Sequence, residues 1–177
     1  SGIGTTAIQL AREFGAISYV TVGNSEKAHF CEKIGAKASI NYKEKDFYDE
    51  IKTITDGKGV NVILDIVGGS YLSRNIRLLR PDGRLLQVSL MEGAKAEIDL
   101  ARVMSRRLTV TGSTLRPRSK AVKAMIASEL FKKVWPLFEE NKINPIIYET
   151  FSFNEAPKAH RLMETSKHIG KIIMTIS

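Results

Sequence analysis

The chain has 177 residues, of which 43% are hydrophobic and 26% are charged, and its formal net charge is +8. This length and composition are typical of one substantial globular domain with room for a small appendage. Because the apolar runs are only a few residues long, we expect no membrane-spanning helix, and the start lacks the pattern of a signal peptide. The single cysteine, Cys31, allows no internal disulfide and favours a reducing compartment, so we expect a cytoplasmic protein.

The excess of basic residues, 27 Lys and Arg against 19 Asp and Glu, makes a nucleic-acid partner possible. The densest basic cluster consists of Arg116, Arg118, Lys120 and Lys123. No aromatic residue lies among them, whereas proteins that stack single-stranded bases place aromatic side chains between basic ones. The cluster therefore favours a solvated helix entrance, and nucleic-acid binding is the disfavoured alternative.

The first ten residues, SGIGTTAIQL, place glycines directly before an apolar helical pattern that continues to Phe14. Glycines let the backbone approach a pyrophosphate closely, and the N-terminus of a helix favours an anion. This pattern is typical of the turn and opening helix of a dinucleotide-binding βαβ unit. The strand that would precede the turn is not present before Ser1, so we expect these residues to belong to a longer polypeptide.

Beyond this segment, strands rich in β-branched residues alternate with helices and short glycine-containing turns. The expected helices are 4–14, 26–34, 47–54, a helix after residue 70 that ends near 79, 100–105, 119–141 and 154–164; the expected strands are 17–22, 38–42, 60–67, 84–88, 108–113, 146–151 and 169–176. Ser25 and Asp46 are the expected N-caps of the second and third helices, and Pro136 should kink or split the long helix. The apolar run VNVILDIV predicts a strand covered on both faces.

This alternation predicts an α/β fold: a doubly wound (Rossmann) parallel sheet with helices on both faces, lacking its first strand. In such a fold, an Asp or Glu about 20 residues after the glycines marks a site that prefers NAD. Val22 and Gly23 follow Gly4 by 18 and 19 residues, and residues 23–25 carry no carboxylate. Lys27 stands ready to bind a 2′-phosphate, which favours NADP(H). The alternative is a solvated lysine in the first turn of a helix.

Five segments together resemble a known family: SGIGTTAIQL, GNSEKA, INYKEKDF, VILDIVGGSY and HIGKII. In this order and spacing they resemble the zinc-free quinone oxidoreductases of the medium-chain dehydrogenase/reductase superfamily, and most closely the p53-inducible quinone oxidoreductases. The resemblance covers the whole chain but only the C-terminal half of such an enzyme. It implies residues 1–145 as the NADP(H)-binding Rossmann domain, and 146–177 as a return segment that would pack on an N-terminal catalytic domain.

The resemblance also implies a set of cofactor contacts. Their placement agrees with the rule that ligands bind at the carboxyl ends of the strands in such sheets. At the pyrophosphate the resemblance places Ser1, Gly2 and Ile3, with Lys171 as a further phosphate candidate, and around the adenosine 2′-phosphate it places Gly23, Asn24, Lys27 and Tyr42. Beside the nicotinamide-side ribose it places Val67 and Gly68, and near the nicotinamide it places Ser89, Leu90, Met91, Leu115 and Arg116. It implies no metal site and identifies no catalytic residue in this half.

The implied activity is hydride transfer from NADPH to a quinone or enone without a metal, in the complete polypeptide, whereas the isolated half is expected to be inactive. The resemblance also implies a homodimer in which the edge strand 108–113 pairs with its counterpart, as an exposed apolar edge strand favours on physical grounds. A non-catalytic nucleotide- or RNA-binding module with a Rossmann fold is the alternative function. A methyltransferase-like domain is disfavoured, because such domains usually carry an acidic residue where this chain has residues 23–25.

The remaining candidate residues have a simpler structural interpretation. Asp65 could orient a ribose, but an Asp near the end of a strand more often accepts hydrogen bonds from loop amides. His29, His160 and His168 lack metal-ligand spacing, and we expect them on the surface. Cys31 is expected to be a small packing residue.

Overall fold

A computed structural model describes residues 1–176, and its chain divides into two compact units. Unit 1 contains Ser1–Glu44 and the chain from Ile126 onward, and unit 2 contains Lys45–Met125. Among residues 1–176, none of the helices is both long enough and apolar enough to cross a membrane.

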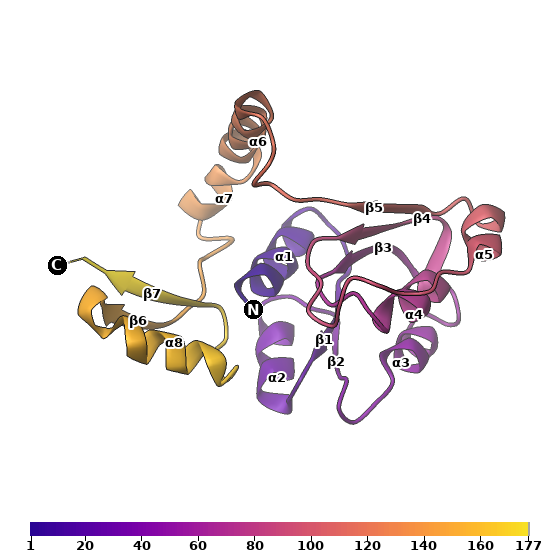
Figure 1. The fold of residues 1–177 in the computed structure, drawn as a ribbon, viewed down its shortest axis with the longest axis horizontal. Coiled ribbons are helices and arrows are strands. Elements are labelled where there is room, and N and C mark those ends of the chain that lie inside the picture. The colour runs from indigo at the N-terminus through magenta and orange to yellow at the C-terminus, as the bar shows by residue number, and fades with distance from the viewer. Residues whose placement is uncertain (177) are drawn as a thin grey trace. The chain divides into compact units, whose positions relative to one another are not determined.

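Unit 1 begins with α1 (Gly2–Glu13), β1 (Tyr19–Val22), α2 (Ser25–Lys33) and β2 (Ala38–Asn41). The Ser1 Oγ accepts a hydrogen bond from the Gly4 N–H at 3.1 Å, so α1 begins two residues earlier than expected. Strands β1 and β2 pair in parallel, with α2 as the crossover between them (Figure 1). Their carboxyl ends therefore lie side by side.

The N-cap of α2 is Asn24, so the expectation of Ser25 was wrong. The Asn24 Oδ1 accepts a hydrogen bond from the Lys27 N–H at 2.8 Å, and its backbone is extended, as an N-cap requires. Ser25 is already the first helical residue. Both residue types cap helices well, and the end of β1 at Val22 decides which of them takes the cap position.

The later part of unit 1 contains α7 (Trp135–Glu139), β6 (Ile147–Ser152), the short 3-10 helix η1 (Phe153–Glu155), α8 (Ala156–Glu164) and β7 (Lys171–Thr175). β6 and β7 pair in parallel, and α8 runs alongside both (Figure 1). The expected helix 119–141 is split into α6 (Lys120–Lys133) and α7 just before Pro136, which confirms the predicted effect of that proline.

A capping box fixes the start of η1 and α8. Glu155 accepts a hydrogen bond from the Ser152 backbone N–H at 3.3 Å and forms an ion pair with Lys158 at 2.7 Å. The Lys158 hydrogen bond, followed by the Ser152 one, holds the pKa of Glu155 below its usual range. Folding therefore favours the deprotonated, carboxylate form of Glu155.

Unit 2 contains α3 (Phe47–Ile54), β3 (Val60–Asp65), α4 (Tyr71–Leu78), β4 (Leu79–Gln87), α5 (Leu100–Ser105) and β5 (Thr109–Gly112). Its three strands form a parallel sheet in the order β3-β4-β5 (Figure 1). Asp46 caps α3, as predicted, through a 2.7 Å hydrogen bond from the Tyr48 N–H. β4 begins at Leu79, earlier than expected, because Leu79 pairs with Val60 ahead of an irregularity in the register.

The core of unit 2 lies on one face of this sheet, where Ile76, Leu79, Leu85 and Leu108 are buried together. Ile63 of β3 packs against this cluster, whereas its neighbours Val62 and Leu64 point to the other face and are 64% and 43% exposed. The expectation that both faces of this strand are covered is therefore wrong within unit 2, because Ile76 and Leu72 of α4 pack on the first face, whereas Val62 and Leu64 stay exposed.

Helices α3 and α4 are joined by a stack that we call the Arg74 stack. The rings of Phe47 and Tyr71 stack with centroids 4.8 Å apart, and the Arg74 guanidinium lies 4.7 Å and 5.0 Å from them. Arg74 also forms a 3.2 Å ion pair with Asp46, the cap of α3. One arginine thus links the start of α3 to the middle of α4.

The α/β fold predicted from the sequence is confirmed. The described strands form three parallel sets, β1-β2, β3-β4-β5 and β6-β7, and α1 is the first element of the described chain. Every pair within these sets is parallel, so the connections are helical crossovers rather than hairpins.

Candidate functional site

The N-terminus of α1 is the first candidate region, and it belongs to unit 1. The first N–H groups of a helix have no partner inside the helix and favour an anion. A Cβ added to Gly2 would lie 2.2 Å from Lys171 Cε, so the stem of this lysine lies directly on the backbone of the turn. The structure thus brings Lys171, which the resemblance implied as a phosphate candidate, to the residues implied for the pyrophosphate.

The carboxyl ends of β1 and β2 gather the residues implied for the 2′-phosphate. The Tyr42 hydroxyl lies against Gly23, where an added Cβ would approach it to 2.9 Å. Asn24 caps the first turn of α2, which carries Lys27. The half-buried Lys27 donates a hydrogen bond from its Nζ to the carbonyl oxygen of Ser166.

Ser166 is a contact of Lys27 that sequence reasoning missed. It is 139 positions away from Lys27, and its backbone has a positive φ of 55°. Because the contact uses a backbone carbonyl, the side chain of Ser166 carries no signal that could have revealed it.

His168 also lies in unit 1 and differs from the expectation of a surface histidine. It is half-buried, and its ring meets the Tyr148 ring edge-on at 6.5 Å between centroids. Burial, with a further effect of nearby positive charge that includes Lys27, lowers the pKa of His168. The neutral imidazole is therefore favoured at pH 7. His29 and His160 are exposed, as expected.

Cys31 of α2 is half-buried, and its burial raises the pKa of the thiol. A thiol that stays protonated is a poor nucleophile. This agrees with the expectation of a packing residue.

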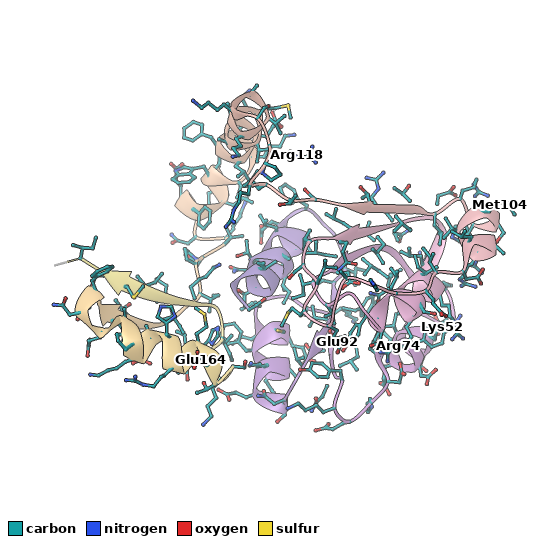
Figure 2. The ribbon with its side chains drawn as sticks, viewed as in Figure 1. Lys52, Arg74, Glu92, Met104, Arg118 and Glu164 are labelled. Atoms are coloured by element: carbon teal, nitrogen blue, oxygen red, sulfur yellow. The ribbon has the colours of Figure 1, made fainter. Side chains whose placement is uncertain are left out.

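In unit 2 the second candidate region lies at the carboxyl ends of β3 and β4. We call residues 66–70 and 89–93 the paired loops, because backbone hydrogen bonds join them. The Glu92 N–H donates to the Val67 carbonyl at 2.8 Å, and the Gly69 N–H donates to the Gly93 carbonyl at 3.2 Å. Glu92, labelled in Figure 2, also accepts a 2.8 Å hydrogen bond from the Ser70 hydroxyl.

The paired loops carry five of the residues implied for the nicotinamide side: Val67, Gly68, Ser89, Leu90 and Met91. Gly68 has a φ of +71°, and a Cβ there would lie 2.9 Å from the Gly93 carbonyl oxygen, so only glycine fits. Leu90 and Met91 are 50% and 76% exposed. A turn fixed by backbone contacts thus presents exposed apolar side chains.

Leu115 and Arg116 follow β5, the neighbour of β4 in the same sheet. The Ser113 N–H donates to the Gln87 carbonyl at 3.0 Å, so the chain leaves β5 at the same sheet edge at which the paired loops begin. Leu115 is 56% exposed, and the basic residues from Arg116 to Lys123 are exposed as well. That exposure fits a solvated segment.

Asp65 accepts hydrogen bonds from loop amides, the simpler of its two interpretations. It is buried, and its Oδ1 accepts from the Val67 and Gly68 N–H groups at 2.7 Å and 2.9 Å. Its other oxygen accepts from Asn75 of α4, a residue that sequence reasoning missed. Within residues 1–176, no three His, Cys, Asp or Glu side chains gather in a way that could hold a metal ion.

A family model described as zinc-binding dehydrogenase matches residues 2–132. The chain belongs to this family. Its fold matches the nucleotide-binding half of medium-chain dehydrogenases/reductases, which confirms the superfamily named from the sequence.

Among the curated relatives, the highly reducing polyketide synthase AN6791 of Emericella nidulans is 33% identical over 180 residues, covering 99% of this chain and 7% of the relative. The 2-haloacrylate reductase of Burkholderia sp is 32% identical over 177 residues, covering 98% of this chain and 52% of the relative. Among solved structures, the quinone oxidoreductase of Escherichia coli complexed with NADPH superposes with a TM-score of 0.82 at 28% identity, covering 98% of this chain and 54% of that one. The chain therefore spans about half the length, or less, of these proteins.

Proposed function

We propose that this chain is the NADP(H)-binding half of a reductase that uses NADPH to reduce a quinone or an activated alkene without a metal. The observation that carries the proposal is the arrangement after β1, where Gly23 and Asn24 stand in place of a carboxylate and Lys27 occupies the first turn of α2. A carboxylate there would repel a 2′-phosphate, whereas an ammonium group attracts it.

The residues present fit such a cofactor. Ser1, Gly2 and Ile3, with Lys171, would hold the pyrophosphate at the N-terminus of α1, where the dipole and the ammonium group favour the same anion. Lys27, with Gly23, Asn24 and Tyr42, would hold the 2′-phosphate. In unit 2, the paired loops together with Leu115 and Arg116 would face the nicotinamide and its ribose.

When bound, NADPH would supply a hydride for the acceptor. The protein's own contribution at this end is positional, since Val67, Gly68, Leu90 and Met91 offer backbone groups and apolar side chains. The one carboxylate of the paired loops, Glu92, accepts a hydrogen bond from the Ser70 hydroxyl. Exposed Leu90 and Met91 would exclude water from one face of the nicotinamide.

The acceptor class is supported by the relatives. The Escherichia coli neighbour is a quinone oxidoreductase, and the Burkholderia relative is a 2-haloacrylate reductase, whose name specifies a halogen-substituted alkene conjugated with a carboxyl group. Both acceptors are electron-poor and accept a hydride at carbon or oxygen, which is why we group quinones with activated alkenes.

The test is NADPH oxidation by the whole natural polypeptide, with a para-quinone, an α,β-unsaturated ketone and a 2-haloacrylate as separate acceptors. We expect oxidation of NADPH, faster than that of NADH, with at least one acceptor. Oxidation of neither cofactor with any acceptor would overturn the proposal. Metal analysis of the active protein tests the zinc-free part, and stoichiometric zinc would contradict it.

We further propose a cytoplasmic homodimer that pairs through β5. This strand lies at the edge of the unit 2 sheet, and its Val110 is 42% exposed. Sedimentation at micromolar concentration should give a dimer, and a monomer would contradict the pairing.

The proposed cytoplasmic location is supported by the single cysteine, which suits a reducing compartment, and cell fractionation tests it.

A further inference from the structure

Asp65 is a buried carboxylate that neutral groups hold in place. It is only 3% exposed and lies at the carboxyl end of β3. Burying a charge is costly unless hydrogen bonds replace the lost water. The Val67 and Gly68 N–H groups and the Asn75 side-chain amide, at 2.7, 2.9 and 3.0 Å, supply them. Charge-assisted hydrogen bonds of this kind are stronger than neutral ones, so Asp65 fixes the turn after β3 firmly.

Asn75 extends this arrangement to α4. It is 6% exposed, and its Nδ2 donates to Asp65 Oδ2. The helix therefore holds the carboxylate from one side, while the turn holds it from the other.

Gln87 extends it to the second of the paired loops. Its Nε2 donates to the carbonyl oxygens of Asp65 and Ser89, at 3.1 Å and 2.6 Å. The end of β3 and the loop after β4 are thus bonded to one side-chain amide. Further along, the backbone hydrogen bonds between the paired loops complete the connection.

We propose that Asp65, Asn75 and Gln87 are positioning residues for the nicotinamide end of the cofactor. None of them needs to touch the cofactor: they set the backbone of the paired loops, which we have proposed to face it. This inference rests on the proposed function. It predicts that disturbing the three residues lowers kcat more than it raises KM for NADPH, because the phosphate contacts of unit 1 remain intact.

The main variant is Asn75→Asp in the whole natural polypeptide, which replaces the donor to Asp65 with a second carboxylate. We expect kcat to fall about 10- to 100-fold, the scale of loss that a displacement of about 1 Å produces. The KM for NADPH should change by less than about 3-fold, since most of the binding free energy comes from contacts that are not altered. Amide hydrogen exchange of residues 66–70 in the protein without cofactor should become faster.

The rescue variant is Asp65→Asn combined with Asn75→Asp. This exchange restores one donor and one acceptor between the two positions, and the amide introduced at position 65 keeps an oxygen for the loop N–H groups. We expect kcat and exchange rates of residues 66–70 to return most of the way to the wild-type values. Gln87→Met is a milder second variant, in case Asn75→Asp does not fold. It removes both hydrogen bonds of the half-buried Gln87 and should speed exchange in residues 89–93 and lower kcat.

The matched control is Thr55→Val. Thr55 is also buried, and its hydroxyl accepts from the Gly59 N–H at 2.9 Å and donates to the Ile51 carbonyl at 2.6 Å, before the amino end of β3. This variant should lower thermal stability without changing kcat or the exchange of the paired loops.

The outcomes separate the two proposals. If the wild type reduces no acceptor with NADPH, the proposed function fails. If the wild type is active, and Asn75→Asp or Gln87→Met speeds amide exchange in the paired loops without lowering kcat, only the positioning inference fails. It also fails if Thr55→Val lowers kcat as much as Asn75→Asp at equal loss of stability, because the effect would then come from stability alone.

Discussion

Lys27 is the residue on which the proposed preference for NADP(H) rests, and Lys27→Met is the perturbation that tests it. The side chain is half-buried, and its Nζ already donates to the Ser166 carbonyl. A bound 2′-phosphate would therefore either displace the Ser166 carbonyl from the Lys27 ammonium group or share that group with it. Met keeps much of the apolar stem and removes the charge together with the hydrogen bond to Ser166.

The size of the effect follows from one favourable contribution and two that oppose it. An ion pair at about 4 Å, at the edge of a protein, has a Coulomb energy of about 4 kcal/mol. Weakening the hydrogen bond to Ser166 costs about 1 kcal/mol, and residual solvation of the phosphate removes part of the rest. About 2 kcal/mol then remains, which corresponds to a roughly 30-fold weaker Kd for NADPH.

The assay is calorimetric titration of the whole natural polypeptide with NADPH and with NADH. For Lys27→Met the Kd for NADPH should rise about 30-fold and that for NADH less than about 3-fold, since NADH has no 2′-phosphate. Lys27→Glu should remove the preference altogether. Lys33→Met, in the last turn of the same helix, is the control and should change neither value. Equal binding of both cofactors by the wild type, or an equal loss for both in Lys27→Met, would refute the assignment.

Three further predictions concern stability. Arg74→Leu, which removes the cation and the ion pair of the Arg74 stack, should lower the free energy of unfolding by about 1–2 kcal/mol in chemical denaturation; no change would mean that the stack contributes nothing net. Glu155→Gln should reduce the loss of stability that the wild type shows as the pH falls below the ordinary carboxyl range, because the pKa of Glu155 is lowered in the folded chain. Thermal unfolding from pH 7 to pH 3 would give parallel profiles for the two proteins if the capping box were unimportant. Gly59→Ala should lower the free energy of unfolding by about 3 kcal/mol or more, because the added Cβ would lie 2.0 Å from a backbone oxygen. Gly15→Ala has a similar positive φ but open space around the Cβ, so it should lower the free energy of unfolding by about 1 kcal/mol, and equal losses would refute the clash.

The pattern of elements could be predicted because local signals agree along most of this chain. Asp46 is a single good cap before an amphipathic helix, and Pro136 cannot continue one, so both were identified correctly. Asn24 and Ser25 are adjacent and equally capable of capping, and no local signal separates them. The choice depends on where β1 ends, which is set by its pairing with β2.

Burial was less predictable than secondary structure. The run VNVILDIV is apolar throughout, and alternation along β3 assigns Ile63 to the core and Val62 to the opposite face. Composition alone indicates that both faces suit an apolar environment, but it does not say which face the helices of unit 2 cover. Asn75 illustrates the same limit, since one polar residue in a helix does not reveal that it faces a carboxylate ten positions earlier.

The two candidate regions are held by different kinds of contact, and this difference affects what a sequence can reveal. At the paired loops, the partners of Asp65 are between two and 22 positions away, so a turn signal such as Gly68 indicates the region. In unit 1, Lys27 meets Ser166 across 139 positions, and Lys171 lies on Gly2 near the opposite end of the chain. Residues after position 145, predicted as a return segment for another domain, therefore already contact the phosphate-binding candidates of unit 1. The positions of Lys27 and Lys171 depend on that segment, so the proposed preference for NADP(H) would require both distant ends of the chain and not the glycine turn alone.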